Sequence, residues 1–222
     1  MIHYPLPLII EPKLQHKYTV IWMHGLGANA KDFFSLAPRL QFKNKDHVKF
    51  IFPNASEQKV SINGSMIMPS WYDIYNVDNE KNINTDDLNN SSKYIETLIN
   101  EEVKNNINYD NIILAGFSQG GVVAIHTALG GVLVQNIKSV LVLSAYHPNT
   151  ELLQTSSGKK ISVNFMHGML DNVIPIELAK KTCIKIKQLN YDSPFTSYNM
   201  AHEVCLEQIK DINSYFSEQF NN

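Results

Sequence analysis

The segment Gly116-Phe117-Ser118-Gln119-Gly120 has the residue types and spacing that present a serine as a nucleophile. The apolar residues 112–115 before it are typical of a buried strand, and residues 122–129 after it, which contain no proline, of a buried helix. A serine in so tight a strand-to-helix turn has its hydroxyl held clear of the sheet. The two glycines lack a Cβ, so the strand and the helix can approach closely. The pattern predicts a nucleophile elbow at Ser118; the alternative is a glycine-rich turn that carries an ordinary surface serine.

A serine hydroxyl needs a base to take its proton, and behind an elbow the usual chain order is serine, then an acid, then a histidine. Asp171 and His202 are the residues that fit this order. Asp171 follows a predicted strand that ends at His167, and His202 follows another at residues 195–199. Both therefore lie past the carboxyl ends of strands, where open α/β sheets bind ligands. We expect Asp171 to hold His202 in the correct tautomer and His202 to deprotonate Ser118.

An acyl-transfer site also needs two backbone N–H groups that face the developing oxyanion. One donor is expected from the residue after the nucleophile, Gln119, and the other from a loop after an early strand. Gly25-Leu26-Gly27 follows the predicted strand 18–23. Its flanking glycines let the backbone curl toward the substrate, so the N–H of Leu26 is the predicted second donor.

Four other histidines compete for a catalytic role. His24 and His167 each precede a glycine at a strand end, and we interpret both as structural residues that bond local backbone. His147 precedes Asp171 and so breaks the chain order, and His126 lies within the elbow helix as a packed or capping side chain. The histidines show no ligand-spaced pair, so no metal site is predicted.

The elements that must position these residues alternate between strands and helices. Strands are predicted at residues 6–10, 18–23, 48–52, 112–115, 139–143, 162–167 and 195–199, and helices at 31–40, 86–106, 122–129, after Pro175, and at 203–220. Such alternation indicates a mostly parallel sheet covered on both faces. The prolines near residues 6–10 confine that strand to an edge of the sheet. A chain of 222 residues without an evident boundary is expected to be one domain spanning 1–222.

Composition excludes several other classes of protein. The formal net charge is −2 and Arg39 is the only arginine, so nothing indicates a nucleic-acid partner or an arginine clamp for phosphate. The N-terminal residues carry no basic region of a signal peptide, and no apolar run has transmembrane length. Cys183 and Cys205 are too few for a disulfide framework, which favours the reducing cytoplasm.

Several motifs together resemble the phospholipase/carboxylesterase family, which includes acyl-protein thioesterases, lysophospholipases and small bacterial carboxylesterases. They are His24-Gly25-Leu26-Gly27, the elbow with Gly121 behind it, His167-Gly168-x-x-Asp171-x-Val173-x-Pro175, His202-Glu203, and Met66-x-Met68-x-x-Trp71-Tyr72-Asp73. The resemblance covers nearly the whole chain in the same order. This sequence differs from many members at Ala28-Asn29, at Ala201, where glycine is usual, and at Ser56, near where many have proline. The first and last differences bear on loop shape, and hence on substrate preference.

The resemblance implies an α/β-hydrolase fold and a serine esterase without a cofactor, which cleaves acyl esters or thioesters through an acyl-serine intermediate. It also implies a hydrophobic acyl groove. The residues expected to line this groove are Leu26, Met66, Met68, Trp71 and Val173. The alternative for the methionine and tryptophan segment is ordinary core.

Residues 55–87 show no clear period, and so long an irregular stretch is typical of a lid or a binding loop. Its centre carries Met66, Ile67, Met68, Trp71 and Tyr72, while its flanks are polar. We predict a flap that moves as a unit over the acyl groove and touches lipid surfaces. The alternative is that the segment packs permanently as core.

Two other functions share these residues. The same triad can cleave amides or peptides, since the leaving group is not written in the motif. A non-catalytic ligand-binding protein could also use the fold, although all three triad residues are present. The expected partner is a small-molecule or lipid acyl ester or thioester, and the sequence leaves open a homodimer and a peripheral membrane contact.

Overall fold

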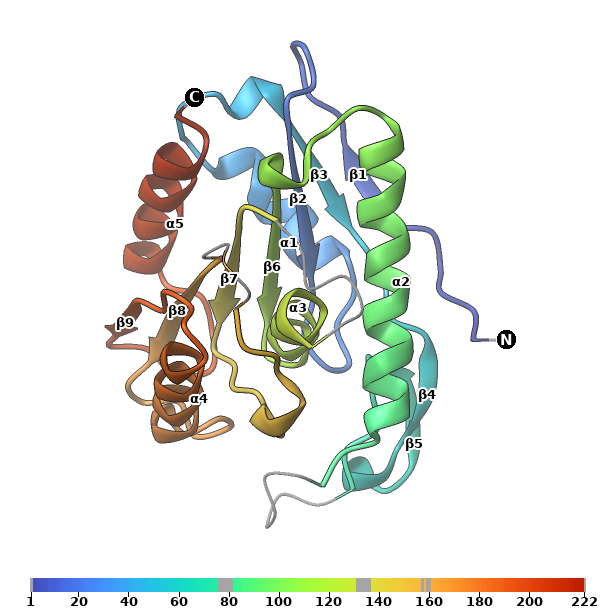
Figure 1. Cartoon of the computed structure of the whole chain (residues 1–222). Helices are drawn as coiled ribbons and strands as arrows, with labels where there is room; N and C mark the ends of the chain where they lie inside the picture. The colour runs from blue at the N-terminus through green and yellow to red at the C-terminus, as the bar shows by residue number, and fades with distance from the viewer. Residues whose placement is uncertain (1, 76–81, 131–136, 157, 159–160, 222) are drawn as a thin grey trace.

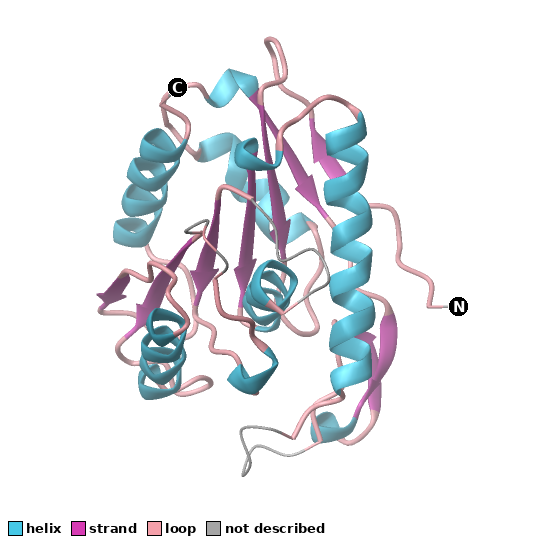
Figure 2. Ribbon diagram, in the orientation of Figure 1, coloured by secondary structure: helices cyan, strands magenta, loops and turns pink. Residues whose placement is uncertain are grey.

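A seven-stranded sheet crosses the centre of the molecule in the order β1-β3-β2-β6-β7-β8-β9 (Figures 1 and 2). The structure is a computed structural model that describes residues 2–75, 82–130, 137–156, 158 and 161–221. The strands of the sheet are β1 (Leu8–Ile10), β2 (Tyr18–Met23), β3 (Val48–Phe52), β6 (Ile112–Phe117), β7 (Ser139–Leu143), β8 (Ser162–Gly168) and β9 (Phe195–Tyr198). All neighbouring strands are parallel except β1, which pairs antiparallel with β3 at the edge. The mostly parallel sheet and the edge position of β1 are confirmed.

Helices cover both faces of this sheet (Figure 1). They are α1 (Lys31–Leu36), α2 (Thr85–Lys104), α3 (Gln119–Leu129), α4 (Ile176–Gln188) and α5 (Leu206–Gln219). Successive side chains along a strand point to opposite faces of the sheet, so each strand contributes side chains to the two cores on either side of it. In β2, Trp22 packs in the core shared with α1 and α5, whereas Ile21 packs in the core shared with α2, α3 and α4.

The helix boundaries follow from local chemistry. At the start of α2 the Asn84 side chain accepts hydrogen bonds from the N–H groups of Asp86 and Asp87, as an N-cap residue does. The helix predicted at 31–40 is α-helical only as far as Leu36. A short 3₁₀ turn, Ala37–Arg39, then follows, with Pro38 in its first turn. Proline lacks the N–H that an α-helix would need there.

The segment 55–87 differs from the prediction of an irregular stretch. It contains an antiparallel hairpin of β4 (Glu57–Val60) and β5 (Met66–Pro69), with Gly64 and Ser65 at positive φ in the turn. Trp71 and Tyr72 are 1% and 4% exposed and belong to the core of α2 and α3. Their burial fits the alternative that this part of the segment packs as ordinary core, and it leaves the β4–β5 hairpin outside that core. Movement of the segment as a flap stays a prediction. Part of the polar flank, residues 76–81, lies outside the described residues.

Both cysteines are free, with Cys183 buried and Cys205 half-buried at the start of α5. Among the described residues, no helix combines the length and the apolar character needed to cross a membrane.

Candidate active site

Ser118 lies between β6 and α3 with φ 52° and ψ −122°, a backbone conformation that costs energy for a residue with a side chain. Its N–H donates to the Leu143 carbonyl of β7 at 2.9 Å, which ties the turn to the sheet. A Cβ on Gly116 would collide with the Gly120 backbone, and a Cβ on Gly120 would come within 2.5 Å of the His24 carbonyl oxygen. The chain can therefore adopt this strained turn because neither glycine has a side chain to prevent the close approach of β6, α3 and the end of β2.

The loops after β8 and β9 are joined at the same edge of the sheet. The N–H of Met169 donates to the Tyr198 carbonyl at 2.8 Å, and the N–H of Leu170 donates to the Met200 carbonyl at 3.1 Å. A Cβ on Gly168 would collide with the carbonyl oxygens of Met200 and Ala201. The backbone therefore brings Asp171 and His202, which directly follow these contacts, into one place.

Asp171 and His202 are hydrogen bonded, with 2.7 Å between His202 Nδ1 and Asp171 Oδ2. The other carboxylate oxygen of Asp171, Oδ1, accepts from the N–H groups of Val173 at 3.0 Å and Ile174 at 2.8 Å. The Asp171 side chain is fully buried, and that of His202 is 16% exposed. Since a carboxylate can only accept, Nδ1 of His202 carries the proton and Nε2 is left with a lone pair. This is the tautomer that a general base requires.

The ring of Phe117, the residue before Ser118, has its centroid 4.8 Å from that of His202, which places His202 against the residue next to the elbow serine. Both Ser118 and His202 are half-buried. Among the described residues, no hydrogen bond joins the Ser118 hydroxyl to His202. Bonds of this kind commonly form or tighten only when substrate binds.

The loop after β2 packs against the elbow. A Cβ on Gly25 would lie 3.3 Å from the Phe117 ring and 3.4 Å from the Cβ of Ser118, so the loop lies directly against the elbow. Gly27 has φ 71°, and its N–H donates to the Pro69 carbonyl at 2.8 Å. In the described part of the chain, neither the N–H of Leu26 nor that of Gln119 donates to a protein acceptor. Both N–H groups thus remain available as hydrogen-bond donors to a ligand.

His24 and His167 bond local backbone, as predicted. His24 Nε2 accepts from the N–H of Ala55 at 3.1 Å, so Nδ1 carries the proton and donates to the Gly25 carbonyl at 2.7 Å. His167 Nε2 donates to the Ile174 carbonyl at 2.8 Å. Burial lowers the pKa of both histidines and keeps them neutral.

His126 and His147 form a buried pair away from the elbow, with 3.3 Å between His126 Nδ1 and His147 Nε2. His126 Nε2 also lies 2.9 Å from Asn89 Oδ1 of α2. Burial lowers the pKa of His126 to about 4, and burial together with the neighbouring His126 lowers the pKa of His147 to about 3. The packed interpretation of His126 is confirmed. Across the described ranges, no group of three or more His, Cys, Asp or Glu side chains is arranged to hold a metal ion.

The residues predicted to line an acyl groove lie in different surroundings. Met66 and Val173 are 60% and 64% exposed, and Leu26 and Met68 are half-buried. A Cβ on Gly27 would lie 3.6 Å from the Met68 sulfur, so this methionine faces the loop that carries Leu26. Trp71 is buried, and its indole N–H donates to the His24 carbonyl at 2.8 Å. For Trp71 the structure therefore favours the alternative of ordinary core.

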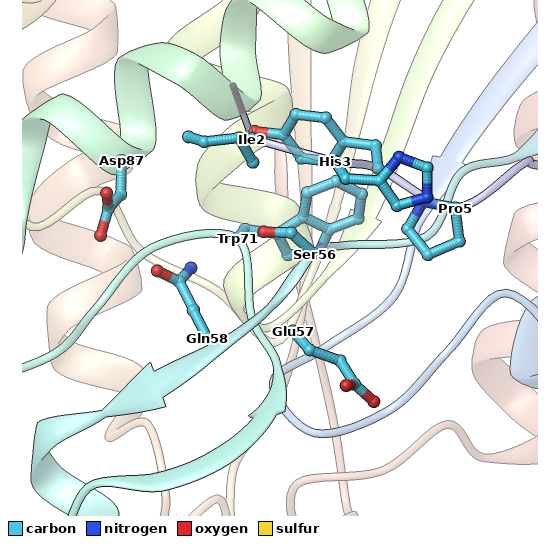
Figure 3. A pocket seen from close by; sticks show the side chains of 9 residues that line it. Ile2, His3, Pro5, Ser56, Glu57, Gln58, Trp71 and Asp87 are labelled. Carbon is cyan, nitrogen blue, oxygen red and sulfur yellow. The ribbon is translucent and has the colours of Figure 1, made fainter.

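Two pockets border these elements. One of about 510 Å³ lies between the N-terminal segment and the start of β4, over Trp71 (Figure 3). Its lining residues are Ile2, His3, Tyr4, Pro5, Ser56, Glu57, Gln58, Trp71 and Asp87. The other, of about 440 Å³, opens beside His202 between α1 and the start of α5, with Phe33, Phe117 and Ile209 among its apolar lining. The pocket next to His202 is the one positioned to hold part of a substrate.

The side chain of Gln119 has a role that the sequence did not reveal. It is 3% exposed, and its Oε1 accepts from the N–H of Trp71 at 2.9 Å while its Nε2 donates to the Tyr72 carbonyl at 2.7 Å. These partners are more than forty positions away in the sequence, so no local spacing signals them. In the sequence, only the apolar character of Trp71 and Tyr72 indicates that this part of the segment is buried.

Comparisons with known proteins agree with this geometry. A family model described as Phospholipase/Carboxylesterase matches residues 5–219. Acyl-protein thioesterase 1 of Gibberella zeae is 31% identical over 226 residues, which cover 96% of this chain and 95% of that protein. Acyl-protein thioesterase 1 of Saccharomyces cerevisiae is 32% identical, with 96% of each chain covered.

Solved structures share the fold. Acyl-protein thioesterase 2 of Zea mays superposes with a TM-score of 0.85 at 22% identity, covering 97% of this chain and 99% of that one. The carboxylesterase of Bacillus cereus superposes with a TM-score of 0.77 at 18% identity, covering 96% and 94%. At these identities the likeness establishes the α/β-hydrolase fold.

Proposed function

This chain belongs to the phospholipase/carboxylesterase family, and we propose that it removes long acyl groups from the cysteine thiols of proteins. The chain is a serine hydrolase of acyl esters or thioesters. The thioester preference is supported by the names of the relatives at 31–32% identity, which are acyl-protein thioesterases.

In the proposed mechanism, Ser118 Oγ attacks the acyl carbon and its proton passes to Nε2 of His202. The tetrahedral intermediate carries its negative oxygen, which accepts hydrogen bonds from the N–H groups of Leu26 and Gln119. When the intermediate collapses, the bond between carbon and sulfur breaks, and His202 gives its proton to the departing thiolate. Water, deprotonated by the same imidazole, then attacks the acyl-serine and releases the fatty acid.

The observation that carries this proposal is the 2.7 Å hydrogen bond between Asp171 and His202 beside the strained elbow of Ser118. A buried carboxylate bonded to Nδ1 leaves Nε2 as a base and stabilises the imidazolium that forms during attack. Neither a glycine-rich structural turn nor a passive binding pocket needs this arrangement.

The proposed acyl groove consists of the apolar side chains of Leu26, Met66, Met68 and Val173. Methionine suits such a surface because its unbranched side chain adapts to different ligands. The leaving group is expected in the pocket beside His202, since that imidazole must reach the departing atom.

A substrate panel tests the leaving group. Kinetics with p-nitrophenyl esters, S-palmitoyl peptides, lysophospholipids and aminoacyl amides should give the highest kcat/KM for S-palmitoyl peptides. Amides should be the poorest substrates. A higher kcat/KM for amides would instead establish the peptidase alternative, and no turnover of any substrate would favour the binding protein.

We also propose that the tip of the β4–β5 hairpin contacts lipid surfaces. Met66 and Ile67 are 60% and 66% exposed there, an arrangement that places apolar area in water. Ile67→Ser should weaken binding to phosphatidylcholine liposomes and slow hydrolysis of a liposome-embedded acyl substrate, while hydrolysis of a soluble ester stays unchanged. Leu206→Ser, which changes an equally apolar residue that is 78% exposed on α5, is the matched control. Equal liposome binding by both variants and the wild type would contradict the contact.

The proposed compartment is the cytoplasm. Both cysteines are free, and Cys183 is buried without a disulfide partner, as is usual for proteins of reducing compartments. Fractionation of cells that express the tagged chain would test this compartment.

A further inference from the structure

We propose that Trp71 and the side chain of Gln119 are positioning residues for the oxyanion hole, which act through the backbone of His24 and Gly25. Neither side chain would touch the substrate. The inference rests on the mechanism under Proposed function, in which the N–H groups of Leu26 and Gln119 hold the oxyanion, and it adds the residues that hold these two donors in place.

The first step is the anchoring of the loop before Leu26. The indole N–H of Trp71 donates to the His24 carbonyl at 2.8 Å. The imidazole of His24 holds the same stretch from the other side, because it accepts from Ala55 and donates to the Gly25 carbonyl. Both peptide groups that precede Leu26 thus have a fixed carbonyl, and this fixes where the N–H of Leu26 lies.

The second step is the anchoring of Trp71 itself. The side-chain amide of Gln119 accepts from the N–H of Trp71 and donates to the Tyr72 carbonyl. It thus satisfies one backbone donor and one backbone acceptor of this segment, as the backbone of a paired β-strand would. The Ser91 hydroxyl of α2 donates to the Trp71 carbonyl at 2.5 Å. The backbone N–H and carbonyl of Trp71 are therefore both hydrogen bonded, and its indole ring is free to hold the His24 carbonyl in place.

The two steps together connect the two donors of the hole. The backbone N–H of Gln119 is one donor, and the side chain of the same residue leads through Trp71 and His24 to the other, the N–H of Leu26. All three side chains on this path are at most 3% exposed, so water does not compete for their hydrogen bonds. Oxyanion stabilisation depends on donors fixed in advance, because reorganisation during the reaction cancels much of the gain.

The consequence for kinetics is specific. A loosened donor weakens binding of the tetrahedral oxyanion more than binding of the planar substrate, so kcat falls while KM changes little. Substitution of a residue that only stabilised the fold would lower the melting temperature but would not lower kcat at unchanged KM.

The chain offers a matched control in its other tryptophan. Trp22 of β2 is 1% exposed, like Trp71, but within the described residues its indole nitrogen has no hydrogen-bond partner. Tryptophan to phenylalanine removes the same atoms at both positions. Only at position 71 does it also remove a hydrogen bond.

The experiment compares Trp71→Phe with Trp22→Phe in the hydrolysis of p-nitrophenyl butyrate. We expect Trp71→Phe to lower kcat about 10-fold or more, less than the roughly 10²–10³-fold loss that follows removal of a donor itself, with KM within about twofold. Inhibition by an alkyl trifluoromethyl ketone, whose serine adduct carries an oxyanion, should weaken by the same factor as kcat. Trp22→Phe should keep both values near wild type.

If Trp71→Phe does not fold, benzothienylalanine at position 71 replaces only the indole N–H with sulfur and keeps the shape of the ring. A kcat for either position-71 variant equal to that of Trp22→Phe would overturn the inference and leave the esterase function intact. A loss of kcat without weaker ketone inhibition would overturn it too. Failure of the proposed acyl-serine mechanism looks different, because the wild type would then neither turn over the ester nor react with the ketone.

Discussion

Asp171 shows how much of the chemistry is decided by single hydrogen bonds. Its Oδ1 is occupied by the N–H groups of Val173 and Ile174, so only Oδ2 faces His202. The carboxylate is thereby fixed in rotation, and the imidazole is fixed with it. Orientation by a buried acid of this kind is what the serine–acid–histidine order requires.

The same bonds make Asp171→Asn a sharp test. The two N–H groups would hold the amide oxygen of asparagine, which directs its NH₂ group toward Nδ1 of His202. Nδ1 would then have to accept, Nε2 would carry the proton, and the base would be lost. We expect kcat for p-nitrophenyl butyrate to fall about 10³-fold or more.

The control for this variant is Asp192→Asn, which changes an exposed aspartate in the loop before β9. Its kcat should stay within about twofold of wild type, as for most surface changes away from a site. If Asp171→Asn retained wild-type kcat while folded, Asp171 would not be the orienting acid.

At the scale of elements, the sequence predicted the buried strands and the long helices well. Strands such as β2 and β7 are continuous apolar runs, and α2 repeats its apolar residues at helical spacing. The hairpin escaped prediction because β4, Glu57-Gln58-Lys59-Val60, has no alternation of apolar residues and β5 exposes two of its four side chains. A two-stranded hairpin at the surface buries few side chains, so its sequence carries little of the apolar pattern by which strands are predicted.

In the candidate site too, residues in local motifs could be predicted from the sequence, and residues that depend on distant contacts could not. Ser118, Asp171 and His202 carry motif and order in the sequence, whereas the hydrogen bonds of the Gln119 side chain depend on contacts between distant segments. Glu102 is another example, since its sequence neighbours gave no reason to expect a buried acid. Long-range pairing of polar groups leaves no local period, and only the assembled fold brings such groups together.

The buried pair of His126 and His147 joins α3 to the loop after β7 and gives the fold a pH dependence. The folded pKa values, about 4 and about 3, lie below the ordinary value of 6.5. Between pH 6.5 and pH 4 the unfolded chain therefore binds more protons than the folded one. The free energy of unfolding should fall with decreasing pH in this window, at about 1.4 kcal/mol per pH unit for each proton.

Urea unfolding at pH 7, 6, 5 and 4.5 would measure this dependence in the wild type and in His147→Gln. The variant removes one titrating group, so its free energy of unfolding should depend less steeply on pH below 6.5. Parallel curves for the two proteins would show that the pair does not contribute.

At the scale of the whole molecule, stability and chemistry occupy opposite edges of the sheet. The candidate site lies at the carboxyl ends of the strands. At the amino ends, Glu102 of α2 is 2% exposed and accepts from Thr19 of β2 at 2.8 Å and from Lys49 of β3 at 2.8 Å. One carboxylate thus joins a helix to two strands far from the substrate.

Glu102→Gln should therefore weaken the fold without weakening catalysis. The neutral amide removes the buried counter-charge of the Lys49 ammonium, whose side chain is only 14% exposed, and leaves it the more distant and exposed Glu11 carboxylate at 4.0 Å. We expect a loss of about 2 kcal/mol or more in the free energy of unfolding, measured with urea, at unchanged kcat. The neighbouring Glu101→Gln, an exposed position, should change stability by less than about 0.5 kcal/mol. Equal effects of the two changes would argue against the network.

The proposed chemistry depends on Ser118 as the nucleophile, activated by His202. Labelling with a fluorophosphonate, followed by peptide mass spectrometry, tests it most directly, because this reagent phosphonylates an activated serine. We expect one label per chain on Ser118 in the wild type, much slower labelling in His202→Ala, and no label in Ser118→Ala. A label on another residue, or an active wild type that stays unlabelled at Ser118, would contradict it.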